Sequence, residues 1–176
     1  MRLNLREIIE IPGGSVPFSQ ELDTALLGFP SVRAYTAPIT AEGKVVNTAG
    51  ILTLQGRLHA EMLCVCDRCG AEFPRTVDLD LHADITADAQ DDDPEVFTLD
   101  GDWLDVDEVL STCFILSMDT KCLCRPDCAG LCDRCGANLN LGPCRCQKPR
   151  DPRMAVLEQL LDNKTDEEEE AAHNSD

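Results

Sequence analysis

Apolar and polar residues alternate most clearly between positions 52 and 85 of the 176-residue chain. Alternation with a period of two is typical of a β-strand that buries one face. The pattern predicts a strand over 52–64, continuous or divided by a bulge at Gly56, and a second strand over 73–85. Residues 66–70 between them predict the turn of a β-hairpin. The inward positions are Leu52, Leu54, Leu58, Ala60, Met62 and Cys64 in the first strand and Val77, Leu79, Leu81, Ala83 and Ile85 in the second.

Weaker strand patterns precede this hairpin. Residues 3–8 alternate and end before the turn-forming run at 12–14, and residues 32–39 form a further candidate that Pro38 interrupts. Residues 86–102 lack periodicity and predict a loop. The aspartates at 91–93 lack the spacing of a calcium-binding EF-hand loop, which favours a solvated acidic loop.

Two helices are predicted from apolar residues that recur with helical spacing. Asp105 or Asp107 can cap the first, and its apolar face holds Val106, Val109, Leu110, Cys113 and Phe114. Cys113 is expected to be a small buried apolar residue there rather than a ligand. The second helix begins at Asp151-Pro152, and its apolar face holds Met154, Leu157, Leu160 and Leu161.

Cysteine is the strongest chemical signal, because eight of the eleven cysteines lie in closely spaced sets. Four thiolates that meet in space form a structural zinc site, and a CxxC turn lets two sulfurs bind one ion. Residues 120–150 have too few apolar side chains for a core of their own and are expected to need metal to hold one shape. The sets are Cys66 with Cys69, Cys124 with Cys128, Cys132 with Cys135, and Cys144 with Cys146.

These sets predict about two structural zinc ions per chain. A local site uses Cys132, Cys135, Cys144 and Cys146, and a second site, which joins the cysteine-rich segment to the sheet, uses Cys66, Cys69, Cys124 and Cys128. An alternative pairing places Cys124 or Cys128 in the local site and leaves out Cys146. For the turn at 66–69, the alternative is a tight turn that binds no metal. Four sulfurs leave no open coordination position, which favours a structural role over catalysis.

The net charge of −18 is unevenly distributed. Residues 78–108 hold thirteen acidic residues and no lysine or arginine, whereas basic residues gather in 121–153. An acidic chain repels phosphate as a whole, so the basic segment is the candidate for contact with RNA or a partner. The alternative is that its basic side chains only balance the thiolates of the metal sites. The candidates are Arg125, Arg134, Arg145, Lys148 and Arg150.

The sequence also bears on location and catalysis. The start of the chain has no apolar signal region, and no apolar run approaches the roughly 18 residues of a membrane span, which predicts a cytoplasmic protein without a membrane partner. In a reducing compartment, clustered cysteines are more often metal ligands than disulfides. The sequence contains no glycine-rich phosphate loop and no nucleophile elbow, which predicts a protein that is not an enzyme and has no small-molecule substrate.

Together, these patterns predict an α+β fold. It is mainly an antiparallel β-sheet with two helices and a cysteine-rich zinc-binding module, followed by a disordered acidic C-terminal tail. The expected division is a β-rich domain with one helix over 1–119, the zinc-binding module and C-terminal helix over 120–161, and the tail over 162–176.

The order of the motifs along the chain resembles the order in a known family. The motifs are Cys66-Asp67-Arg68-Cys69, the run from Cys124 to Asn140 that contains Gly130-Leu131-Cys132-Asp133-Arg134-Cys135-Gly136, and Cys144-Arg145-Cys146. Over about residues 3–161 the chain resembles the bacterial YceD family, the large ribosomal RNA subunit accumulation proteins. The resemblance implies a non-enzymatic cytoplasmic protein that supports synthesis, processing or accumulation of large-subunit ribosomal RNA.

Two kinds of partner and one other function stay open at this point. The partner is large-subunit ribosomal RNA or its precursor, contacted directly or through a basic ribosomal protein that the acidic surface would suit. The alternative function is a redox-regulated holdase chaperone, in which oxidation of the thiolates ejects zinc and exposes apolar surface.

Overall fold

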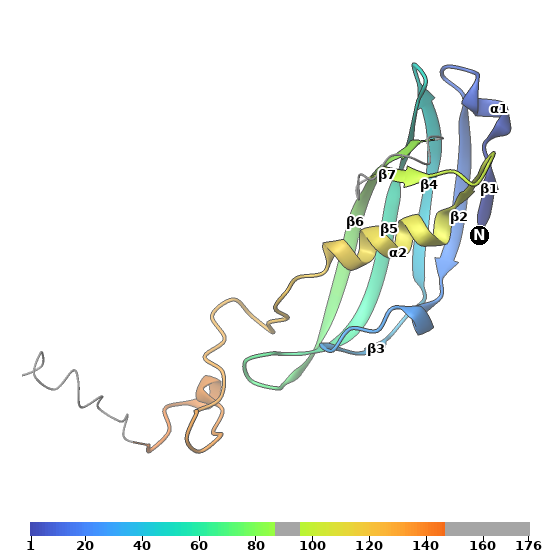
Figure 1. Cartoon of the computed structure of the whole chain (residues 1–176). Coiled ribbons are helices and arrows are strands. Elements are labelled where there is room, and N and C mark those ends of the chain that lie inside the picture. Colours follow the sequence, from blue (N-terminus) through green and yellow to red (C-terminus); the bar gives the residue numbers. More distant parts are fainter. Residues whose placement is uncertain (87–95, 147–176) are drawn as a thin grey trace, which may run out of the picture. The chain divides into compact units, whose positions relative to one another are not determined.

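The structure, a computed structural model, describes residues 1–86 and 96–146. The chain divides into two compact units, Met1–Gly130 and Leu131–Asp176. In the first unit, helix α2 (Val106–Ser117) lies across one face of a β-sheet (Figure 1). The three-part division expected from the sequence stays a prediction, because most of its C-terminal part lies outside the described residues.

The sheet is almost entirely antiparallel. Its strands run in the order β2-β4-β5-β6-β7, and β3 also pairs with β5. Strands β1 and β8 pair separately, and among the described strands only β6 and β7 are parallel. The strands are β1 (Arg2–Asn4), β2 (Ser15–Leu22), β3 (Val32–Tyr35), β4 (Ile39–Thr48), β5 (Ile51–Val65), β6 (Glu72–Thr86), β7 (Val96–Thr98) and β8 (Trp103–Asp105). Besides α2 there is a short helix α1 (Arg6–Ile9), and single 3-10 turns lie at Thr24–Leu26 and Leu139–Leu141.

The β5–β6 hairpin confirms the predicted alternation. Its register runs without interruption from Leu52 opposite Ile85 to Cys64 opposite Phe73, so the bulge considered at Gly56 does not form. Gly56 instead lies opposite Gly43 of β4, where a Cβ on Gly56 would come within 2.3 Å of a backbone oxygen. The two glycines therefore permit a close approach of the neighbouring strands.

Several N-terminal elements differ from the expectation. The strand expected over 3–8 is only partly right: β1 ends at Asn4, and α1 follows from Arg6. The Asn4 side-chain oxygen accepts from the Arg6 amide at 3.0 Å and closes the turn between them. Leu5 and Ile8, at helical spacing, are both buried. Strands β2 and β4 were not predicted, because Pro17 and Gly43 interrupt their alternation.

The loop expected over 86–102 is also partly wrong. Val96–Thr98 forms β7, which pairs in parallel with the end of β6, whereas β8, Trp103–Asp105, begins just after the expected loop. Three-residue strands are too short to show alternation in the sequence. The aspartates at 91–93 lie outside the described residues.

Helix α2 confirms the first helix prediction. The Asp105 carboxylate accepts from the Asp107 amide at 3.1 Å and caps the helix. Phe114 is fully buried, and its ring meets Phe29 edge-on with centroids 5.8 Å apart, while Cys113 is half-buried. The described residues thus hold two α-helices, α1 and α2, whereas the helix expected from Asp151 lies outside them.

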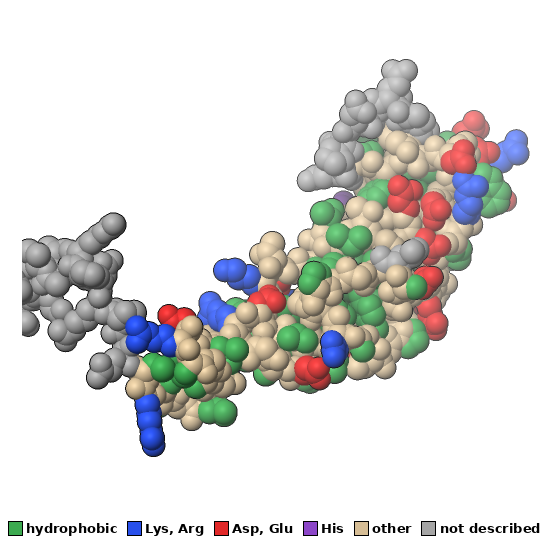
Figure 2. Space-filling model, turned by 60° about the horizontal axis from the view of Figure 1, so that its bottom comes forward, with side chains coloured by type: hydrophobic (Ala, Val, Ile, Leu, Met, Phe, Trp, Pro, Cys, Tyr) green, Lys and Arg blue, Asp and Glu red, His purple; other side chains and the backbone are tan. Residues whose placement is uncertain are grey.

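The polar side of the sheet carries paired charges. Arg57 lies 3.2 Å from Asp80, and His59 lies 2.6 Å from Asp78, whose carboxylate, together with Glu61, raises the pKa of the imidazole. Acidic side chains also follow one edge of the first unit (Figure 2). None of the helices in the described ranges is long and apolar enough to cross a membrane.

The buried side chain of Asn47 bonds backbone groups of helix α1 and of the β4–β5 turn. Its amide donates to the carbonyls of Ile8 and Ile9 at 2.7 and 2.8 Å, and its oxygen accepts from the Gly50 amide at 2.8 Å. We expect Asn47→Ala to lower the free energy of unfolding by about 2–4 kcal/mol, because it leaves buried partners unsatisfied. Urea denaturation measures this, with Asn4→Ala, an exposed asparagine that accepts one hydrogen bond, as the control that costs about 1 kcal/mol or less.

Candidate metal centres

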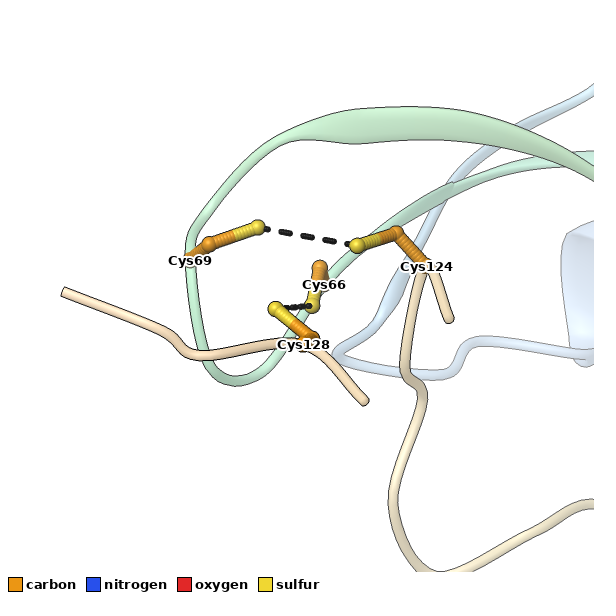
Figure 3. A group of neighbouring side chains, drawn as sticks. All are labelled: Cys66, Cys69, Cys124 and Cys128. Carbon is orange, nitrogen blue, oxygen red and sulfur yellow. Dashed lines mark hydrogen bonds between the residues drawn. The ribbon is translucent and has the colours of Figure 1, made fainter. Parts of the chain in front are cut away.

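Four cysteine sulfurs meet at the tip of the β5–β6 hairpin. Cys66 and Cys69 come from the turn, and Cys124 and Cys128 come from the segment that follows α2 (Figure 3). All four sulfurs lie within 4.8 Å of one another, with 3.8 Å between Cys66 and Cys128 and 3.8 Å between Cys69 and Cys124. Cys66, Cys69 and Cys128 are buried.

The turn that carries the first two cysteines is held by its own backbone. The Cys66 amide donates to the Ala71 carbonyl at 2.9 Å, and the Gly70 amide donates to the Cys66 carbonyl at 2.8 Å. Gly70 has φ of 69°, a left-handed conformation that glycine adopts without strain. The hairpin therefore presents both sulfurs on the same side of a tight turn.

Hydrogen bonds attach the second pair of cysteines to this turn. The Asp67 amide donates to the Cys122 carbonyl at 2.9 Å, and the Asp67 carboxylate accepts from the Cys122 amide at 2.6 Å. The Arg68 guanidinium donates to the Cys128 carbonyl at 3.0 Å. Arg75 of β6 pairs with Asp119 just after α2. The segment therefore reaches the hairpin through backbone contacts as well as through its sulfurs.

The second unit holds the other four-sulfur group, made of Cys132, Cys135, Cys144 and Cys146. Its first turn repeats the same backbone bonds: the Cys132 amide donates to the Ala137 carbonyl at 2.8 Å, and the Gly136 amide donates to the Cys132 carbonyl at 2.9 Å. The sulfurs of Cys132 and Cys144 are 3.4 Å apart. Cys132 is buried, whereas Cys135 is exposed.

The two turns share an identical hexapeptide that the sequence analysis missed. Residues 66–71 and residues 132–137 both read Cys-Asp-Arg-Cys-Gly-Ala. The glycines at the fifth position have the same φ of 69°. A search of the chain against itself would have found this repeat and predicted two turns of one geometry.

In the first group, one sulfur has a lowered pKa. Burial raises the pKa of the Cys66 thiol, but backbone hydrogen bonds outweigh the burial and lower the pKa to about 6. The donors are Cys124, Cys69 and Arg68. Burial, together with the neighbouring thiols, raises the pKa of Cys124 to about 12. The group thus favours one negative charge near neutral pH, which a cation would neutralise.

The second group follows the same rule. Backbone hydrogen bonds from Cys135 and Arg134 lower the pKa of Cys132 to about 7. The neighbouring Cys135 sulfur, then burial, raises the pKa of Cys146 to about 12. Thiolates are the form that binds metal, so each group has one ligand that is ready at neutral pH.

The donor sets fit zinc. A tetrahedral ion with Zn–S bonds of about 2.3 Å separates its sulfurs by about 3.8 Å. The separations of 3.8 Å in the first group match this value, and all eleven cysteines are free thiols. The sulfurs group as one local and one bridging set, and not in the alternative pairing that leaves out Cys146. Four sulfurs in each set leave no position for a substrate.

The remaining cysteines lie outside both groups. Cys64 and Cys122 are buried in the main core, and Cys113 is on α2. The Arg75 guanidinium lies 3.8 Å from the Cys122 sulfur. Burial, first, and the neighbouring Cys122 thiol raise the pKa of Cys64 to about 11, so it behaves as a neutral core side chain.

The candidate basic residues fall in different parts of the chain. Arg125 belongs to the first unit and lies 3.4 Å from Asp127. Arg134 and Arg145 are exposed side chains of the second unit. Lys148 and Arg150 lie outside the described residues. A shared basic surface therefore stays a prediction.

Comparison with known proteins gives consistent matches. The family model for the large ribosomal RNA subunit accumulation protein YceD matches residues 54–161, a range that contains all eight grouped cysteines. Uncharacterised proteins of Mycobacterium tuberculosis and Mycobacterium bovis are 28% identical over 122 residues, covering 66% of this chain and 58% of theirs.

A plant protein is also similar. The chloroplastic homolog 1 of the large ribosomal RNA subunit accumulation protein YCED from Zea mays is 24% identical over 147 residues, covering 65% of this chain and 50% of its own length. The chain therefore spans only 50–58% of the length of these relatives. No solved structure matches the chain.

Proposed function

Because the chain belongs to the YceD family, we propose that it is a ribosome-biogenesis factor that supports synthesis, processing or accumulation of large-subunit ribosomal RNA. One observation carries the proposal: the region that matches the family, 54–161, is the region that contains both four-cysteine groups. The groups are closed sets of ligands, which favours a structural role for the metal over catalysis at these sites.

Zinc has a structural role in this proposal, with about two ions per chain. Cys66, Cys69, Cys124 and Cys128 would hold one ion, and Cys132, Cys135, Cys144 and Cys146 would hold the other. When bound, zinc supplies a tetrahedral cross-link between segments that have little apolar contact of their own. Asp67 and Arg68 orient the first set by binding the backbone of the segment after α2.

The function is tested by sedimentation of the native protein from its own host cells. We expect it to co-sediment with precursors of the large ribosomal subunit and not with small-subunit precursors, which serve as the internal control. Protein that sediments free, with no loss of large-subunit ribosomal RNA on its depletion, would contradict the proposal. Release of zinc by mild peroxide together with a gain of chaperone activity would instead support a holdase.

The exposed arginines of the second unit are the proposed contacts to phosphate. We expect the double variant Arg134→Ala with Arg145→Ala to bind large-subunit precursor RNA with a weaker dependence on salt. The slope of log Kd against log salt concentration should fall by about two, one for each phosphate contact. The measurement is the dissociation constant over a series of salt concentrations.

The matched control for this test lies on the sheet. Lys44→Ala with Arg57→Ala removes the same charge from exposed positions of the first unit and should leave the slope of log Kd against log salt concentration unchanged. If the arginine variant keeps its zinc and its full affinity at low salt, the arginines do not contact RNA. A basic ribosomal protein bound to the acidic surface then becomes the preferred partner.

A further inference from the structure

The repeated hexapeptide has an outer side that the first copy uses to bind a peptide chain. Asp67 engages both backbone groups of Cys122: its amide donates to the carbonyl at 2.9 Å, and its carboxylate accepts from the amide at 2.6 Å. One residue of the turn thus satisfies the complete backbone of one residue of an extended segment. The pairing resembles the addition of a strand to a sheet edge.

Further contacts of the first copy are also made to the backbone of the bound segment. Arg68 donates to the Cys128 carbonyl at 3.0 Å, and a Cβ on Gly130 would lie 3.0 Å from the Arg68 carbonyl oxygen, so the bound segment runs close to the turn. These hydrogen bonds use backbone groups of the bound segment and not its side chains. The turn can therefore bind segments of different sequence.

The second copy has the same backbone conformation as the first but different neighbours. Asp133 stands where Asp67 stands, and in the described part of the chain its amide has no hydrogen-bond partner. There its carboxylate contacts only the Cys132 thiol, at 3.7 Å. Asp133 is exposed on the surface of the second unit. The groups that bind Cys122 in the first copy are therefore present and accessible in the second.

Apolar side chains of the same unit are exposed as well. Leu131 directly precedes the turn and is 46% exposed, and Leu141, just beyond it, is 89% exposed. In the first copy, Val65 precedes the turn and is partly buried. A bound segment would cover part of this apolar surface. The Asp133 carboxylate itself would repel phosphate, so its own ligand is a backbone N–H group, while the neighbouring Arg134 guanidinium can still attract phosphate.

We propose that the turn Cys132–Ala137 binds an extended segment of a partner polypeptide through the N–H and C=O of a single residue. Asp133 supplies the acceptor and the donor, as Asp67 does for Cys122. The inference concerns a partner protein and does not depend on the proposed role in ribosomal RNA accumulation.

The first copy also provides the probe. A nonapeptide that copies residues 121–129, with serine in place of its three cysteines, is titrated into isotope-labelled, zinc-saturated full-length protein and followed by NMR. We expect saturable shifts of the amides of Asp133 and Arg134 at peptide concentrations on the order of 1 mM, the affinity that a few net hydrogen bonds provide. Amides of the polar sheet face should not move.

Variants identify the contact. Asp133→Ala should weaken binding about fivefold to tenfold, because it removes the acceptor, while Asp133→Asn, which keeps an acceptor oxygen, should retain most of the affinity. Asp80→Ala removes the same charge from the exposed sheet face and should bind like the unaltered protein. Zinc content and the spectrum of the sheet show whether each variant is folded.

Three outcomes would overturn the proposal. The turn does not bind peptides if no amide from Cys132 to Ala137 shifts, or if Asp133→Ala binds as tightly as the unaltered protein. A single-stranded RNA that shifts these amides when the peptide shifts none of them would assign the turn to RNA alone. Shifts that grow with protein concentration and without peptide would assign it to a second copy of this chain.

Discussion

Replacing Cys66 with serine is expected to release residues 121–130 from the tip of the β5–β6 hairpin and to lower the stability of the first unit by several kcal/mol. Cys66 is 1% exposed, and its sulfur lies 3.8 Å from that of Cys128. Structural zinc contributes roughly 10–16 kcal/mol in zinc-finger peptides, and loss of one of four ligands forfeits a large part of such a contribution. Faster hydrogen exchange of the Asp67 and Cys122 amides would show the release.

The control for this variant is Cys113→Ser. Cys113 is half-buried on α2 and belongs to neither four-sulfur group, so the same chemical change should cost about 1 kcal/mol and leave two zinc ions bound. Cys66→Ser should leave one. If both variants keep two zinc ions and unfold at the same urea concentration, Cys66 is not a ligand and the turn is a simple hairpin turn.

The sequence predicted the central hairpin because its alternation is long and has one parity on each strand. Fourteen residue pairs keep one register in β5 and β6, so a single slip would expose the whole apolar face. Strand β4 carries the same signal in Ile39, Ala41 and Val45, all buried, but Gly43 breaks the apolar series. Helix α1 has only four residues and buries one of them, Ile8, which is too short a pattern to separate a helix from a strand.

The grouping of the cysteines was predictable from spacing, whereas their surroundings were not. CxxC fixes two sulfurs locally, and simple accounting joined Cys66 and Cys69 with Cys124 and Cys128, as the structure does. The contacts of Asp67 and Arg68 depend on where the segment after α2 passes the hairpin. Local sequence holds no information on that path, since the partners are 55 and 60 residues apart.

Replacing Cys132 with serine is expected to unfold the second unit and to leave the sheet folded. Among residues 131–146, Cys132 is the only buried side chain, so this described part of the unit has no apolar core to hold its shape without metal. Zinc content should fall from about two ions to one, because the ligands of the two groups belong to separate units.

The hydrogen-exchange patterns of Cys132→Ser and Cys66→Ser should differ. Amides of residues 132–142 should lose protection from hydrogen exchange in Cys132→Ser, while those of β4, β5 and β6 keep theirs. Cys66→Ser should show the reverse near the hairpin tip and leave the second turn, with its Cys132 and Gly136 bonds, intact. Equal and global unfolding by both variants would mean that the two groups form one cooperative structure, and the assignment of one local and one bridging site would then be wrong.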